Sequence, residues 1–157
     1  MPALDVASQY ADLMTSVFSA PIAAKAWFAT AAIILALVQI STAARMWGHL
    51  RGVIPLGDAT VGVVHRWSGR IAVLCTLPVV FHCVFILGFQ TTDLRIAIHS
   101  VVGSIVYGVL CAKLIAVHNH TYPGWVLPAV GGTLFGCLAV LWLTSSFWYF
   151  TNVNFGF

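Results

Sequence analysis

Charge is scarce in this chain of 157 residues, of which only 7% are Asp, Glu, Lys or Arg and none is glutamate. Soluble domains carry about 25% charged residues. Hydrophobic residues make up 61% of the chain. Such a chain cannot cover its surface with groups that water solvates, so it must turn most of that surface to lipid. The composition therefore excludes an ordinary soluble domain.

The sequence also lacks the motifs of self-sufficient enzymes. Its four cysteines lie inside apolar segments and form no Cys-x-x-Cys pair, which argues against a zinc site and a c-type haem. It contains no phosphate-binding loop and no nucleophile paired with a base. Seven basic residues, mostly near the ends of apolar runs, are too few to bind nucleic acid. These absences argue against an enzyme that works alone.

Four long apolar segments dominate what is present, and a spanning helix needs only about 20 such residues. We predict an all-α integral membrane protein, a four-transmembrane-helix bundle, with residues 1–157 forming a single membrane domain. Aromatic residues at the segment ends are typical of membrane interfaces. Residues 1–24 form a weakly amphipathic lead-in without the features of a removable signal peptide. The predicted spans are 26–45, 65–89, 94–118 and 125–150.

The basic residues predict an orientation. Most of them flank the connection between the first two spans, and one more precedes the connection between the last two. Because cytoplasmic loops are enriched in Lys and Arg, both termini are predicted to lie outside the cytoplasm. The membrane is predicted to be a bacterial inner (cytoplasmic) membrane.

Histidines are the most informative residues, because ionisable groups inside spans are costly and usually functional. The second and third spans are antiparallel, so residues equally far from the turn near Thr91 lie at equal depth. This counting gives two levels roughly 25–28 Å apart. Each level would offer two imidazoles, the axial ligand set of a haem b iron. The predicted pairs are His82 with His99, and His65 with His118.

The neighbourhood of these histidines adds detail. His65 and His99 each begin a His-x-x-x-Gly element, and Gly69 and Gly103 would leave room for a flat macrocycle. Spacings of 17 and 19 residues, however, miss a whole number of helical turns by about 100°. The two histidines of one helix therefore do not share a face unless the helix bends, and Pro78 supplies a predicted kink in the second span.

Other polar residues fit less specific roles. Arg66, Arg70 and Arg95 are candidates to pair with haem propionates, and Lys113 is a further one. The alternative for each is that its charge reaches out to lipid headgroups. His49 and His120 are interpreted as loop or headgroup residues.

Three stretches carry a resemblance to known membrane proteins: HRWSGR at 65–70, FHCVF at 81–85 and HSVVGSIVYGVLCAK at 99–113. The bundle and its His-x-x-x-Gly elements resemble b-type cytochromes of the cytochrome b561 and ferric-reductase kind. The same stretches also look like a small uncharacterised four-helix membrane family of actinobacteria. The first resemblance implies haem ligation by His82 and His99, and more weakly by His65 and His118.

We therefore expect a haem-b transmembrane electron-transfer subunit of a respiratory-chain type, with one haem or two. Its partners would be the lipid bilayer, other redox subunits and a quinol pool, and not nucleic acid. The main alternative is a haem-free structural or assembly subunit of a membrane complex. A proton or solute pathway with histidine relays is a third hypothesis, although no carboxylate accompanies the histidines within the spans.

Overall fold

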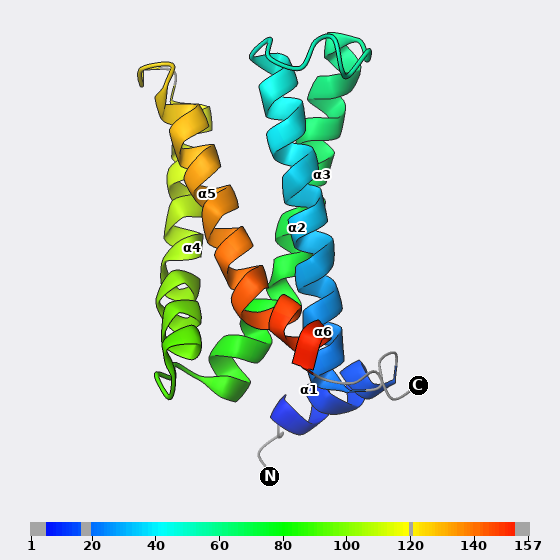
Figure 1. Cartoon of the computed structure of the whole chain (residues 1–157), viewed down its shortest axis with the longest axis vertical. Coiled ribbons are helices and arrows are strands. Elements are labelled where there is room, and N and C mark those ends of the chain that lie inside the picture. The colour runs from blue at the N-terminus through cyan, green and yellow to red at the C-terminus, as the bar shows by residue number, and fades with distance from the viewer. Residues whose placement is uncertain (1–5, 17–19, 120, 153–157) are drawn as a thin grey trace.

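The fold is known from a computed structural model that describes residues 6–16, 20–119 and 121–152. All regular structure within these residues is helical (Figure 1). The elements are α1 (Val6–Thr15), α2 (Pro21–Met46), α3 (Asp58–Phe81), the π-helical segment η1 (His82–Leu87), α4 (Leu94–His118), α5 (Val126–Trp142), the π-helical segment η2 (Leu143–Phe147) and α6 (Trp148–Asn152).

The four predicted spans are confirmed as four helices long and apolar enough to cross a membrane: Pro21–Met46, Asp58–Leu87, Leu94–His118 and Val126–Asn152. The first begins earlier than predicted because Pro21 occupies its first turn. Backbone N–H groups there have no partner within the helix, so proline, which has no N–H, costs no hydrogen bond. The second begins at Asp58, since an acidic first turn suits the helix dipole. The third begins where the Asp93 carboxylate accepts a hydrogen bond from Ile96 N at 2.9 Å.

The helices pack as two pairs that share only one broad contact. α2 packs along α3, α4 packs along α5, and α2 joins the pairs by packing against α5. α3 and α4, although consecutive, hardly touch, and Figure 1 shows the pairs diverging toward the end that carries the 47–57 and 119–125 connections. Small residues allow α2 to be central. Its buried alanines are Ala23, Ala24, Ala26, Ala32 and Ala36.

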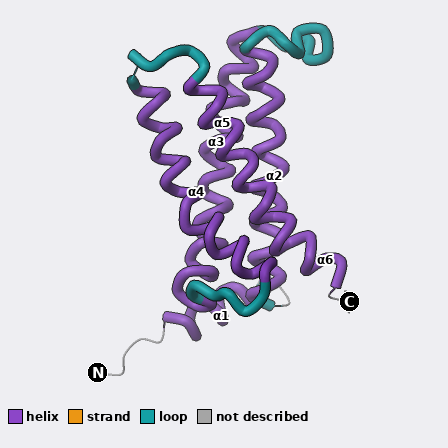
Figure 2. The backbone as a smooth tube through the Cα atoms, turned by 60° about the vertical axis from the view of Figure 1, so that its left-hand side comes forward, coloured by secondary structure: helices purple, strands orange, loops and turns teal. Residues whose placement is uncertain are grey.

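Both described ends of the chain lie at the same end of the bundle, as an even number of spans requires. α1 lies there across the ends of the long helices (Figure 2). We call this the terminal end, and the end with the two connections 47–57 and 119–125 the connection end. The outer surface carries many exposed large apolar side chains, as contact with a bilayer requires.

The spans are irregular at the terminal end. α3 continues through Pro78, which the sequence predicted as a kink, and widens into η1 at His82. α5 widens in the same way into η2 at Leu143. Short π-helical segments inside α-helices are rare and often mark functional sites, and both of these lie at the level of His82 and His99.

Candidate functional site: two histidines on one cavity

A cavity of about 750 Å³ separates the two helix pairs. Its wall comes from α2, α3, α4 and α5, with η1 and η2 at the terminal end, and is mostly apolar. Large apolar cavities with a few placed polar groups are the usual form of small-molecule and cofactor sites. The polar side chains on its wall include His65, His99, Gln39 and Lys113.

Helical periodicity decides which histidines reach this cavity. On α4 the lining residues recur every three or four positions from His99 through Gly103 to Lys113, as one face of a helix requires. His65 and Gly69 begin the matching stripe on α3. His82 and His118 lie off these stripes, as the predicted mismatch of about 100° requires.

His65 is held from the neighbouring helix by Thr42. Its Nδ1 lies 2.9 Å from Thr42 Oγ1, and this hydroxyl donates its single proton to the carbonyl oxygen of Val38 at 2.6 Å. The hydroxyl oxygen must then accept from the ring, so we assign His65 the tautomer with the proton on Nδ1. The lone pair of Nε2 is left for a metal. Metal-bound histidines almost always donate their other ring N–H in this way.

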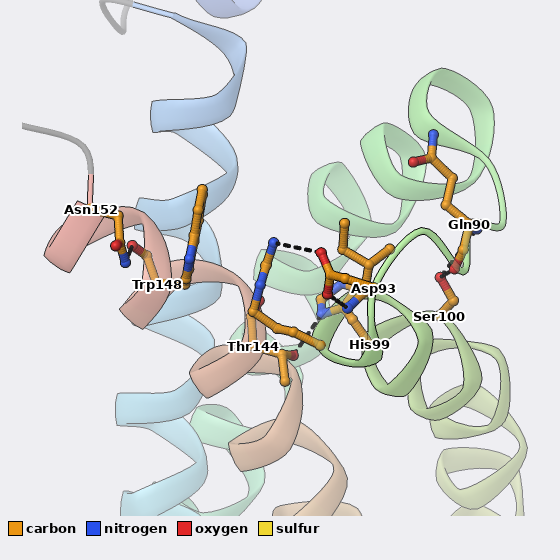
Figure 3. Close-up of polar contacts among 9 residues, drawn as sticks. Gln90, Asp93, His99, Ser100, Thr144, Trp148 and Asn152 are labelled. Carbon is orange, nitrogen blue, oxygen red and sulfur yellow. Dashed lines mark hydrogen bonds and ion pairs between the residues drawn. The ribbon is translucent and has the colours of Figure 1, made fainter.

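His99 has the same arrangement at the terminal end. Its Nδ1 lies 2.9 Å from Thr144 Oγ1, and that hydroxyl donates to the carbonyl oxygen of Val140 at 2.7 Å. Figure 3 shows His99 and Thr144 pointing toward one another from α4 and η2. The same assignment follows, with Nε2 unprotonated. Each of these histidines with its threonine is a half-site: His65 with Thr42, and His99 with Thr144.

The two half-sites lie at opposite ends of the cavity. At 1.5 Å per residue, His65 is about 33 Å from the end of its helix at Leu87, whereas His99 is about 8 Å from the start of α4 at Leu94. Both Leu87 and Leu94 are at the terminal end. The imidazoles are therefore about 25 Å apart along the bundle and cannot bind one iron.

The second histidine of each predicted pair lies at the expected depth but does not line the cavity. His82 is buried beside Tyr10, with ring centroids 5.7 Å apart, and its Nδ1 has no hydrogen-bond partner within the described residues. His118 is exposed and donates from Nδ1 to the carbonyl oxygen of Leu114 at 2.8 Å. Neither predicted pair is assembled here around a common centre. His49, in the loop where the sequence placed it, lines the cavity; His120 falls outside the described residues.

The predicted basic residues separate into two groups. Arg66 and Arg70 are exposed and do not line the cavity, and the Arg70 guanidinium stacks 5.2 Å from the Trp67 ring. Arg95 lies close to the His99 half-site, because it donates to the carbonyl oxygen of Thr144 at 2.7 Å. It also stacks 4.3 Å from the Trp148 ring. Arg95 therefore braces the helix that carries the threonine.

Both predicted glycines line the cavity, but their surroundings differ. A Cβ atom on Gly69 would lie 3.1 Å from Gln39 Nε2, whereas one on Gly103 would meet Leu141 only at 3.7 Å. Gln39 is fixed because it donates to the His65 carbonyl oxygen and to Ser68 Oγ, the latter at 2.8 Å. Gly69 thus has a packing role as well as facing the cavity.

Sequence reasoning missed the threonines and Tyr107. Tyr107 donates to Thr76 Oγ1 at 2.8 Å, a side-chain hydrogen bond between α4 and α3 on the cavity wall. A polar residue in an apolar span could have drawn attention to each of them. Threonine is so common in helices, bonded to its own backbone, that this signal is weak.

The fold and site define a four-span helical membrane protein with a central cavity and two histidine half-sites. The chain belongs to the family of unknown function DUF6529, whose model matches residues 5–157. No curated protein and no solved structure matches it. The resemblance to an uncharacterised family is confirmed only as membership of a family of unknown function, and the resemblance to cytochrome b561 stays a prediction.

Proposed function

We propose that this protein is a haem-b-binding electron-transfer subunit of a membrane oxidoreductase complex. One observation carries the proposal: two histidines, each fixed by a threonine in the tautomer that offers Nε2, line one apolar cavity at levels about 25 Å apart. This separation is close to the roughly 30 Å thickness of the hydrocarbon core. Electron transfer between the two faces of a membrane needs a redox centre near each.

The cavity fits a macrocycle better than it fits a bare metal ion. No group of three or more His, Cys, Asp or Glu side chains able to hold a metal ion occurs in residues 6–16, 20–119 and 121–152. A haem needs only one or two axial imidazoles and apolar walls. The separation of α3 from α4 also removes a steric objection, because helices packed side by side lie about 8–10 Å apart and leave no room for a haem.

The protein's own residues would do three things for such a cofactor. His65 and His99 would each supply one axial nitrogen, and haem supplies the one-electron chemistry when bound. His118 and His82 lie at matching depths but do not line the cavity, so one axial ligand from the chain is proposed at each level. The apolar wall would exclude water. The proposed electron partners are a quinol pool and a partner redox protein.

We also propose an orientation. The connection end carries Arg51 in its first loop, and Arg66 and Arg70 lie in the half of α3 nearer that end. By the positive-inside rule it would face the cytoplasm, with both termini outside. Cysteine scanning of the 47–57 loop with a membrane-impermeant reagent in intact cells tests this. Labelling of the loop from outside would contradict it.

The test of function is a dithionite-reduced minus oxidised spectrum of the purified protein, with a pyridine haemochrome assay of haem per chain. We expect a sharp reduced alpha band and two haems per chain. One haem per chain would mean that only one of the two half-sites binds haem. A folded, monodisperse sample that has no haem and takes none up would contradict the proposal.

The second candidate is a haem-free assembly subunit. Its supporting observation is the surface of the last span, of which no residue in the most apolar 18-residue stretch is buried within the chain. Such a surface suits contact with a larger membrane partner as well as with lipid. Co-purification of a stable partner with colourless protein would favour this candidate.

A further inference from the structure

Lys113 is the only Lys, Arg, Asp or Glu among the described residues that line the cavity. It belongs to the same α4 face as His99 and Gly103. It lies five residues before the end of α4, and His65 lies seven residues after the start of α3. Both are thus about 8–10 Å from the connection end. The single charge of the cavity wall is therefore level with the His65 half-site.

No acidic residue of the described chain neutralises this lysine. Asp58 pairs with Arg45 at 3.0 Å, and Asp12 and Asp93 lie at the terminal end. Within residues 6–16, 20–119 and 121–152, no ion pair joins Lys113 to a carboxylate. A half-buried ammonium in apolar surroundings needs a counter-charge or water, because removing an unpaired charge from water is costly.

Comparison with Arg66 and Arg70 argues against simple contact with headgroups. These arginines belong to the same half of the bundle and are exposed on its outer surface, as side chains that reach lipid headgroups are. Lys113 is less exposed and lines the interior. Lys113 is therefore placed to bind a group inside the cavity.

We propose that Lys113 binds the anionic group of a ligand whose body is otherwise apolar, at the connection end of the cavity. The ligand class is an amphipathic carboxylate. Haem b with its propionates has this chemistry, and so does a fatty acid. For haem the inference rests on the proposed function and deepens it; for a fatty acid it stands independently.

The test compares acids with their esters. Haem-free protein is titrated with haemin and with haemin dimethyl ester, and separately with cis-parinaric acid and its methyl ester. Lys113→Gln should weaken binding of the acid by about tenfold or more, the usual worth of a hydrogen bond to a charged group, and leave the ester unchanged. The affinity of each probe is compared between protein variants in the same detergent. The fraction of the probe that partitions into detergent is then the same in each measurement and cancels.

Two variants serve as controls. Arg70→Gln removes the same charge from the outer surface of the same half of the bundle, and should change neither probe. Lys113→Arg keeps the charge and should retain preference for the acid. Equal effects of Lys113→Gln on acid and ester, or equal effects of Arg70→Gln and Lys113→Gln on the acid, would overturn the proposal.

The outcomes separate this proposal from the haem proposal. Binding of haemin by wild-type protein with no effect of Lys113→Gln would overturn the role of Lys113 alone. Binding of parinaric acid but not haemin, with loss in Lys113→Gln, would support Lys113 and contradict haem. If Lys113→Gln does not fold, the wild-type protein provides the test. It should bind each acid more tightly than its ester, and equal affinities would overturn the proposal.

Discussion

The two ends of the cavity carry the same device in different surroundings. At each end a threonine hydroxyl bonds a carbonyl one turn back and holds a histidine Nδ1 at 2.9 Å. The His65 half-site is built from regular α-helices and is braced by Gln39. The His99 half-site depends on a π-helical segment and is braced by Arg95. The same hydrogen-bond pattern leads us to assign the same tautomer at both ends, although the helix geometry differs.

The largest expected effect comes from the histidines themselves. His65→Ala and His99→Ala should each remove about half of the haem per chain, because each empties one level. His49→Ala should retain all of it. Pyridine haemochrome assays on protein of equal monodispersity measure this. Full haem in His65→Ala would show that the two ends are not equivalent.

Removing the threonine hydroxyl should have the next largest effect. Thr42→Val and Thr144→Val should weaken haem binding by about 10–100-fold, as loss of a bond to the outer nitrogen of a ligand usually does. Serine at either position should restore it. Nitrogen-15 NMR of the haem-free protein reports the tautomer directly, so an unchanged Nδ1–H signal in the valine variants would refute the assignment without reference to haem.

Replacing the two cavity glycines by alanine should change the stability of the protein in opposite directions. Gly103→Ala should raise thermal stability by about 1 kcal/mol, because alanine is the better helix former and meets only ordinary contact at 3.7 Å. Gly69→Ala should lower it by about 1–3 kcal/mol, because Gln39 must leave its hydrogen bonds. Unfolding curves in one detergent compare them. Stabilisation by both substitutions would mean that the Gln39 side chain can move away from residue 69 without loss of stability.

The smallest effect concerns the Arg–Asp pair at each end, Arg45 with Asp58 at the connection end and Arg95 with Asp93, at 3.9 Å, at the terminal end. Asp93→Ala should cost about 1 kcal/mol, because it removes the cap of α4. Asp58→Ala should cost about 0–1 kcal/mol, because its carboxylate is exposed and Arg45 keeps hydrogen bonds to the carbonyl oxygens of Ile54 and Leu56. Thermal unfolding measures which variant loses more stability. A greater loss from Asp58→Ala than from Asp93→Ala would contradict the view that the Arg45 hydrogen bonds to carbonyl oxygens hold the 47–57 loop without the ion pair.

Composition and periodicity predicted the architecture well because a bilayer imposes strong rules. A run of about 20 apolar residues can satisfy its backbone in lipid only as a helix or in a closed barrel. Errors were limited to helix starts, where Pro21 and Asp58 extend the helices beyond the apolar run. The faces were predictable too, because a spacing of 17 residues cannot place His65 and His82 on one side of a helix.

By itself, the sequence determined the four spans, the depths of the histidines and which of them share a helical face. All three follow from distances along a single helix. Only the tertiary structure decided that α3 and α4 part around a cavity, that Thr42 and Thr144 meet His65 and His99, and that Lys113 is turned inward. Those facts depend on how helices pack sideways, and in lipid that packing depends on small residues and single hydrogen bonds spread over the chain.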